Sequence, residues 1–334
     1  MRGDPAVSRV SDSGGSTRIT LALAGDTMLG RGVGDRLRTG RVDFFFDEVI
    51  ALTRGADLFV LNLECCISER GERWPAPGKP FFFRAPPEAV DVLVALGVGC
   101  VTLGNNHALD FGVPALLDTL DYLGGAGIAV TGAGKDVDKA RAPAIVETRQ
   151  ARVAMIGVTD HPADFAADES APGVAYADLK RGVPDWLTAS VAETAADVVL
   201  VSPHWGPNMV AQPVPHVRKA ANALRKSGAT LIAGHSAHVV QGVHDRALFD
   251  LGDFVDDYAV DTNLRNDLGM LFLVTIEDGV TKMLEAVPLK LEYCFTRLAD
   301  GADAVAVARQ FLDSSVAFGA HAWESGGRIL VRMA

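Results

Sequence analysis

The chain of 334 residues is long enough to bury a large core, and 49% hydrophobic with 22% charged residues is a globular composition. Its 31 Lys and Arg residues against 42 Asp and Glu residues give a net charge of −11, which argues against a nucleic-acid-binding protein because a phosphate backbone must meet clustered positive charge. The longest apolar stretch, residues 89–103, contains Asp91 and is too short to cross a bilayer. We therefore expect neither a nucleic acid nor a membrane as partner.

The first residues are polar, rich in Ser and Gly, and lack the apolar segment of a signal peptide. We predict a disordered tail over residues 1–17 and a single domain over residues 18–334. The four cysteines include the adjacent pair Cys65 and Cys66 but no CxxC motif, and adjacent cysteines make a poor structural disulfide. This pattern indicates buried thiols in a reducing cytoplasm.

Short apolar runs alternate with amphipathic stretches along the chain. We predict strands over residues 19–24, 57–62, 99–103, 153–158, 197–202 and 230–233. We predict helices over residues 86–96, 113–123 and 215–226. The C-terminal part is expected to complete a second sheet with a strand after residue 281, a helix over 302–311 and a strand over 328–332. Strands separated by helices of this length predict βαβ units and an α/β fold.

Polar side chains stand where these strands end. They are Asp26, Glu64, Asn106 with His107, His204, and His235 with His238. Singly, Asp26 suits a turn, Asn106 an Asx-turn and His204 a satisfied core histidine. Together they indicate a site, because ligands gather at the carboxyl ends of strands in open α/β sheets. Carboxylate, amide and imidazole groups are ligands for divalent ions.

Eight stretches follow one another between about residues 19 and 260: AGDTMLGR, LNLECCIS, FRAPPEAVDVL, TLGNNHALDFG, TGAGKDVDKARAPAI, SPHWGPN, AGHSAHVVQGV and LGDFVDDY. In these motifs the chain resembles the CapA (poly-γ-glutamate synthesis) family of the calcineurin-like metallophosphatase superfamily. The resemblance implies a two-sheet sandwich core flanked by helices, with a metal site at the sheet edges.

The resemblance also implies roles for individual residues. Asp26 and His238 would belong to a first metal position, and Glu64 would bridge to a second. Asn106, His204 and His235 would complete the second position. His107 would stand where the phosphatases keep a general acid, with Asp110 orienting its ring.

Two departures from the superfamily pattern weaken the first metal position. The opening Asp-x-His motif is Asp26-Thr27-Met28, and the closing Gly-His-x-His motif is stretched by one residue to end at His238. The remaining oxygen-rich ligands favour Ca²⁺, with Mg²⁺ and Mn²⁺ as alternatives. No organic cofactor is expected.

Three functions are weighed. The first is a metal-dependent peptide epimerase like those of the lasso-peptide epimerase branch, which invert the Cα of a C-terminal residue in a ribosomally made peptide. Such an enzyme needs two proton-transfer groups. His107 with Asp110 would be one pair, and the second would combine His204, His235 or His238 with Asp253 or Asp256. The alternatives are a two-metal phosphoester hydrolase and an accessory protein of poly-γ-glutamate capsule synthesis, whose members normally carry a membrane anchor.

Three further residues receive predictions. Arg84 is expected to meet an anionic group such as a peptide carboxylate, with a surface salt bridge as the alternative. Trp205 is expected to form the floor of a pocket for an aromatic side chain of the substrate. The alternative is that Trp205 packs under the metal-binding loop. Asp253 is expected to orient a histidine. The substrate is predicted to be a peptide, and nothing in the sequence indicates the oligomeric state.

Overall fold

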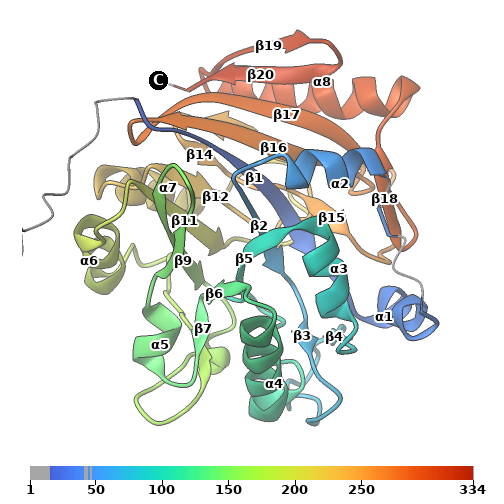
Figure 1. Ribbon diagram of the computed structural model, residues 1–334, viewed down its shortest axis with the longest axis vertical. Coiled ribbons are helices and arrows are strands. Elements are labelled where there is room, and N and C mark those ends of the chain that lie inside the picture. Colours follow the sequence, from blue (N-terminus) through green and yellow to red (C-terminus); the bar gives the residue numbers. More distant parts are fainter. Residues whose placement is uncertain (1–15, 41–43, 46, 334) are drawn as a thin grey trace, which may run out of the picture.

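Two stacked β-sheets with helices on their outer faces form the fold of this chain (Figure 1). The computed structural model describes residues 16–40, 44–45 and 47–333. The predicted α/β two-sheet architecture is confirmed. Most of the predicted tail lies outside the described residues, but its last residues are held: the Thr17 amide donates to Asp278 Oδ1 over 2.8 Å. All four cysteines are buried free thiols, as predicted.

The larger sheet has ten strands in the order β19-β20-β17-β16-β1-β2-β5-β6, with β15 beside β1 and β18 beside β17. The strands are β1 (Arg18–Thr27), β2 (Leu58–Leu63), β5 (Val98–Thr102), β6 (Ala129–Thr131), β15 (Asp253–Val255), β16 (Leu268–Glu277), β17 (Val280–Glu292), β18 (Phe295–Leu298), β19 (His321–Ser325) and β20 (Arg328–Arg332). Strands β1, β2, β5 and β6 run parallel, as the βαβ prediction requires.

The prediction that the C-terminal strands complete a second sheet is wrong. Strand β16 pairs antiparallel with β1 on one side and with β17 on the other, so β17 and β20 extend the sheet that contains β1. The long β16–β17 hairpin decides this, because antiparallel strands joined by a short turn pair with each other first.

The smaller sheet has six strands in the order β13-β14-β12-β11-β9-β8. They are β8 (Ala144–Glu147), β9 (Arg152–Thr159), β11 (Val198–His204), β12 (Leu231–Ala233), β13 (Val243–His244) and β14 (Ala247–Leu248). Two short pairs lie outside the sheets: β3 (Cys66–Ile67) with β4 (Arg84–Ala85), and β7 (Ala133–Gly134) with β10 (Gly173–Val174).

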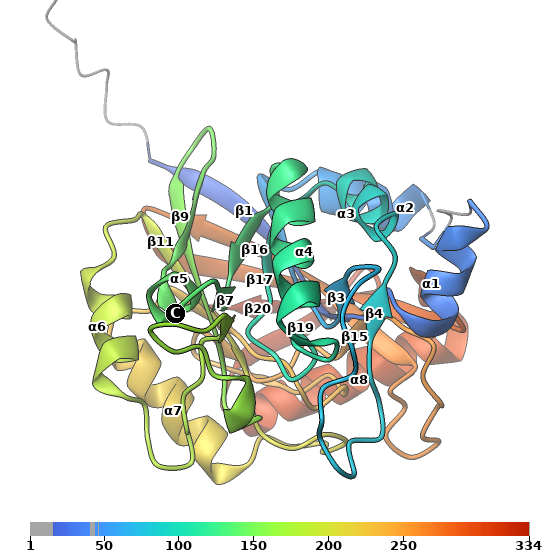
Figure 2. The same cartoon turned by 90° about the horizontal axis from the view of Figure 1, so that it is seen from below.

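Helices pack on the outer faces of the two sheets and, in the case of the last helix, on the inner face of the larger sheet (Figures 1 and 2). They are α1 (Arg31–Arg38), α2 (Asp47–Arg54), α3 (Ala89–Leu96), α4 (Gly112–Gly125), α5 (Val137–Arg141), α6 (Asp185–Glu193), α7 (Pro215–Lys226) and α8 (Gly301–Ala317), with a 3₁₀ turn at Ala163–Phe165. Helices α1 to α4 pack on the larger sheet, and α6 and α7 on the smaller one. Among the described residues, no helix has the length and apolar character that crossing a bilayer requires.

The side chains of the central strands alternate between two apolar layers. Leu21 and Leu23 of β1 point into the core between the sheets, where they meet Met155 of β9. The intervening Ala22 and Ala24 face the layer under α1 to α4. Both faces of β1 are therefore buried, which explains why the strand reads as a continuous apolar run.

A glycine near the end of β1 brings two distant strands together. A Cβ atom at Gly25 would lie 1.8 Å from the Gly252 carbonyl oxygen, and the Asp26 amide donates to that same oxygen over 2.9 Å. The pairing register of β1 shifts at this point, and Asp26 becomes the partner of Asp253 on β15. Only glycine permits this approach of two backbones.

Replacing Gly25 with alanine should therefore destabilise the fold by about 3 kcal/mol or more, because neither backbone can move without breaking the sheet. Gly124→Ala is the matched control: nothing lies within 4 Å of the added methyl group. That substitution should stabilise helix α4 by about 0.5–1 kcal/mol. Urea unfolding curves measure both. Equal stability of Gly25→Ala and the parent chain would show that the close approach of the Gly25 and Gly252 backbones does not require glycine.

Candidate metal centre

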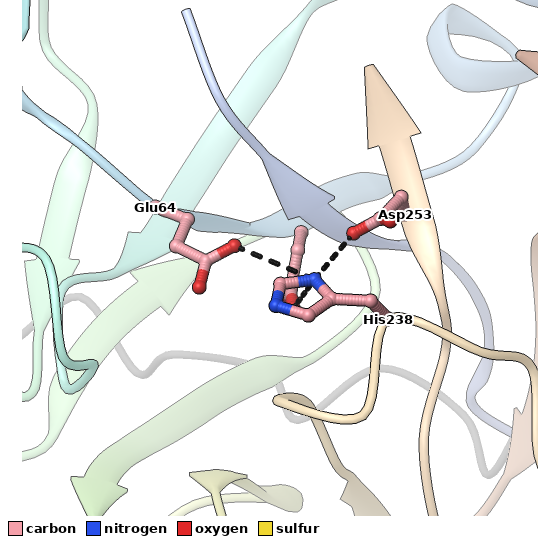
Figure 3. A group of neighbouring side chains, drawn as sticks. Glu64, His238 and Asp253 are labelled. Carbon is pink, nitrogen blue, oxygen red and sulfur yellow. Dashed lines mark hydrogen bonds and ion pairs between the residues drawn. The ribbon is translucent and has the colours of Figure 1, made fainter. Parts of the chain in front are cut away.

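Four buried side chains with metal-binding atoms meet where strands of the larger sheet end. Asp26, Glu64, His238 and Asp253 each offer one ligand atom, and these atoms lie within 4.8 Å of one another. They come from the end of β1, the residue after β2, the loop after β12 and the start of β15. Figure 3 shows the His238 ring between the carboxylates of Glu64 and Asp253.

His238 connects the three carboxylates. Its Nδ1 atom lies 2.8 Å from Asp253 Oδ1, 3.3 Å from Asp26 Oδ2 and 3.9 Å from Glu64 Oε2. The loop that carries it has left-handed backbone at Ser236 (φ 108°) and His238 (φ 57°), an uncommon state for residues other than glycine. Asp250 holds this loop by accepting the Ala237 amide over 2.7 Å.

Two of the ligands predicted for a second metal position, His204 and His235, lie beside the carboxylates of the cluster. His204 Nε2 is 3.9 Å from Glu64 Oε1, and His235 Nδ1 is 3.2 Å from Asp26 Oδ1. His235 also contacts the Ser202 hydroxyl through Nε2 over 3.0 Å. The smaller sheet thus delivers two imidazoles to carboxylates held by the larger sheet.

Several ligand-type atoms of this centre are buried without a hydrogen-bond partner among the described residues. They are both carboxylate oxygens of Glu64, Asp253 Oδ2, Asn106 Oδ1 and His204 Nε2. Buried polar atoms without partners are costly, so a concentration of them marks a place where a ligand belongs. Carboxylate and amide oxygens with imidazole nitrogens are suited to a divalent cation, and the residues fit that group.

Burial and mutual repulsion set the protonation of the carboxylates. Burial raises the pKa of Glu64 well above its usual value and that of Asp253 to about 6. Burial also acts on Asp26, but its hydrogen bond to His235 and the charge of His238 bring its pKa below the usual range. Burial opposes protonation of His238, yet Asp253 and Glu64 outweigh it and raise the pKa of that ring.

A chain of amides holds the centre and was not anticipated from the sequence. Asn62 on β2 donates from Nδ2 to Asp26 Oδ1 over 2.7 Å, and Asn105 donates from Nδ2 to Asn62 Oδ1 over 2.9 Å. Asn105 Oδ1 accepts the His107 amide over 3.0 Å. In the sequence, the only sign of this role for Asn62 is that it is a single polar residue within an otherwise apolar run.

His107 is held by Asp110 beside the centre. Its Nδ1 atom lies 2.6 Å from Asp110 Oδ2, and its Nε2 atom lies 4.0 Å from Glu64 Oε1. Lys79 pairs with the other Asp110 oxygen over 2.6 Å, and the Phe83 ring stacks on the imidazole at 4.0 Å. Burial lowers the pKa of His107 although Asp110 opposes it. The ring is therefore neutral and able to accept a proton.

An open pocket of about 280 Å³ adjoins His107 and Asn106. His161 borders the same pocket, and its Nδ1 atom lies 2.5 Å from the buried carboxylate of Asp160. Its ring lies 5.3 Å from that of His204, measured between centroids. The sequence prediction assigned His161 no role, although its position just after β9 matches the other strand-end residues.

Arg84 and Trp205, which were predicted to contact the substrate, have partners within the protein. The Arg84 guanidinium lies 4.1 Å from the centroid of the Phe111 ring and donates to the Arg70 carbonyl oxygen over 3.2 Å. Trp205 is 2% exposed and donates from Nε1 to the Phe249 carbonyl oxygen over 2.9 Å. Neither side chain lines the pocket beside His107, because each is used in packing.

The fold and centre define an α/β protein with two stacked sheets and a buried carboxylate–imidazole cluster of divalent-cation type. Residues 20–258 match the family model described as "Bacterial capsule synthesis protein PGA_cap". The chain belongs to this family, to which CapA proteins also belong, as the sequence motifs predicted.

Relatives agree with this assignment. The probable polyglutamine synthesis accessory protein Rv0574c of Mycobacterium tuberculosis is 31% identical over 324 residues, covering 82% of this chain and 85% of its own. The PGA biosynthesis protein CapA of Bacillus subtilis is 29% identical over 245 residues, covering 72% and 63%. The capsule biosynthesis protein CapA of Bacillus anthracis is 27% identical over 287 residues, covering 82% and 68%.

Solved structures with a similar course of the chain include a hypothetical protein from Thermus thermophilus, at 15% identity and a TM-score of 0.49, covering 81% of this chain and 99% of that one. The calcineurin-like phosphoesterase YfkN from Bacillus subtilis is 16% identical with a TM-score of 0.43, covering 86% and 89%.

Binding of a divalent cation should stabilise the protein more at about pH 8 than at about pH 5. Carboxyls whose pKa is raised, such as Asp253 at about 6, hold protons at the lower pH and must release them to the ion. Melting temperatures with and without Ca²⁺ at both pH values measure the difference. If Ca²⁺ raised the melting temperature of Glu64→Gln as much as that of the parent chain, the ion would bind elsewhere.

Proposed function

We propose that this protein is a metal-dependent peptide epimerase that inverts the Cα of the C-terminal residue of a ribosomally made peptide, such as a lasso-peptide precursor. One observation carries the proposal: two imidazoles, each fixed by an aspartate, border the same open pocket beside the cation cluster. His107 is held by Asp110 and His161 by Asp160. Inversion requires one group that removes a proton and another that returns one from the opposite face.

The proton balance of the reaction closes with these two side chains. The neutral imidazole of one histidine takes the Cα proton on its Nε2 atom, and the electron pair of the C–H bond moves toward the carbonyl oxygen. The other histidine, protonated at the start, delivers its proton to the opposite face of Cα. No atom is gained or lost, and the reverse reaction uses the same groups with exchanged roles.

Neighbouring residues keep the two rings ready. Asp110 fixes the ring of His107 so that Nε2 faces the cluster, and Lys79 keeps Asp110 in place. A divalent cation at the cluster would supply positive charge that stabilises the negative charge developing on the carbonyl oxygen.

We propose Ca²⁺ as the ion, with Mg²⁺ and Mn²⁺ as competitors. Met28 takes the place where the Asp-x-His motif carries a histidine, and it is fully buried in the apolar layer under the helices. Asp253 joins the cluster from β15, so the first position is rich in oxygen. The four buried thiols suit the reducing cytoplasm as the place of the reaction.

Phosphoester hydrolysis is the second candidate, and the position of Glu64 favours it. One oxygen of Glu64 faces His204 and the other faces His238, each at 3.9 Å, as a carboxylate bridging two ions would. An accessory role in capsule synthesis, the function in the names of several relatives, would require no turnover.

Isotope exchange separates these functions. In D₂O, with Ca²⁺ and a peptide substrate, we expect deuterium at the Cα of the C-terminal residue with no hydrolysed product, measured by mass spectrometry. Generic phosphomonoesters should release no phosphate under the same conditions. If the parent chain releases phosphate and His107→Gln does not, the hydrolase function is supported in place of the epimerase function. Inactivity of the parent chain in both assays would favour the accessory role.

Substitutions should separate metal binding from proton transfer. Asp26→Ala and Asn106→Ala should lose bound metal and exchange together, since Asp26 belongs to the cluster and Asn106 is a predicted ligand whose buried Oδ1 atom has no partner among the described residues. His107→Gln and His161→Gln should keep their metal and lose at least about a hundredfold in exchange rate. Metal content by mass spectrometry and deuterium uptake give the two readouts. Full exchange in the His107 variant would remove that residue from catalysis.

A further inference from the structure

Helix α7 carries a concentration of positive charge. The helix has four basic residues, Arg218, Lys219, Arg225 and Lys226, and no acidic residue. Lys180 and Arg181 add to them from the segment before α6. This arrangement stands out on a chain whose Asp and Glu residues outnumber its Lys and Arg residues and whose net charge is −11. We call Lys180, Arg181, Arg218, Lys219 and Arg225 the α7 cationic surface.

Two open pockets flank the helix, and Lys219 borders both. One, of about 450 Å³, is lined by Lys180, Arg181 and His216 together with apolar side chains such as Leu179 and Val183. The other, of about 240 Å³, is lined by Arg218, Arg225 and His244 with Phe249 and Phe318. No acidic residue lines either pocket.

Much of this charge is unneutralised. Lys180 and Lys219 are exposed and make no ion pair with any described residue. Arg181 and Arg225 have one acidic partner each, Asp178 at 3.1 Å and Asp245 at 2.9 Å. An anionic ligand would therefore meet cations without first displacing internal partners, except at these two arginines.

A single carboxylate separates this surface from the reaction pocket. Asp160 binds His161, which borders the reaction pocket, through one oxygen. Its other oxygen lies 3.2 Å from His216 Nε2, and His216 borders the larger of the two α7 pockets. Asp160 therefore connects a histidine of the reaction pocket with a histidine of the larger α7 pocket.

We propose that the α7 cationic surface binds an acidic, carboxylate-bearing peptide segment. A helix is about 10 Å across and an extended peptide advances about 3.3 Å per residue, so acidic side chains three to four residues apart reach both pockets. The apolar lining of the pockets suits the intervening side chains. A long nucleic acid would extend beyond these five cationic side chains, and a single small anion would fill only one pocket.

In the reaction proposed above, this segment belongs to the peptide whose reacting residue enters the pocket between His107 and His161; this part of the inference rests on the proposed function. The substrate class is then a peptide with an acidic stretch several residues away from the residue that is inverted.

Binding of a fluorescent glutamate-rich decapeptide to the full chain tests the surface, with EDTA present so that the metal centre does not contribute. We expect binding that weakens as salt is raised, and at least about tenfold weaker binding of the same peptide with glutamine in place of glutamate. The double variant Arg218→Glu/Lys219→Glu should lose at least about tenfold in affinity. The neutral variant Arg218→Gln/Lys219→Gln should show a smaller loss in the same direction and guards against misfolding.

The matched control is Lys135→Glu/Arg309→Glu, which changes the net charge equally at exposed sites away from α7. It should bind like the parent chain. Equal binding of the glutamate and glutamine peptides, or equal loss in the control, overturns the proposal. If inorganic phosphate displaces the peptide completely, the α7 cationic surface is a small-anion site instead. If a short oligonucleotide binds at α7 more tightly than the peptide, the surface is a nucleic-acid-binding surface instead.

The two proposals fail separately. If peptide binding requires Arg218 and Lys219 but no peptide exchanges deuterium, the proposed reaction fails and the binding surface stands. If exchange occurs but kcat/KM for an acidic peptide is the same in the double variant as in the parent, the epimerase stands and the α7 surface is not its substrate site.

Discussion

The burial of several carboxylates at one point is the constraint on which the rest of this structure depends. Asp26, Glu64 and Asp253 lie within a few ångströms of one another at positions almost free of solvent. Like charges in a low-dielectric interior repel strongly, and each loses its hydration. Such a cluster persists only where positive charge and hydrogen-bond donors are supplied, and here His235, His238 and the amide of Asn62 supply part of them.

The surrounding fold is organised to hold this cluster. Gly25 lets β1 approach the Gly252 backbone so closely that Asp26 and Asp253 become neighbours. The left-handed turn at Ser236 and His238 directs an imidazole back onto them. Because the large apolar layers on both faces of each sheet stabilise the backbone, the fold can maintain this locally unfavourable arrangement. The strain and the unpartnered atoms are concentrated where a ligand can compensate them.

Two histidines border the open pocket beside the centre, and an aspartate holds each of them. His107 is clamped between Asp110 and the ring of Phe83, and His161 by Asp160. The chain belongs to the capsule synthesis protein family. Met28 is buried in the apolar layer under the helices, and Asp253 contributes a third carboxylate to the cluster. The Asp160 pair also connects the pocket with the cationic face of α7.

The sequence by itself determined the parallel strands, helix α7 and the polar residues at the strand ends, because apolar periodicity and strand-end position are local properties. Asp26, Glu64, His235 and His238 could thus be named in advance. Only the tertiary structure decided that β17 joins the sheet of β1, that Asn62 and His161 lie beside the cluster and its pocket, and that Arg84 and Trp205 contact other parts of the protein. Those outcomes depend on which sheets stack, which strand pairs with which, and where side chains from distant segments point. No local sequence pattern encodes these outcomes. A polar residue at a strand end gives the same pattern whether its side chain faces a pocket or packs against a neighbouring ring.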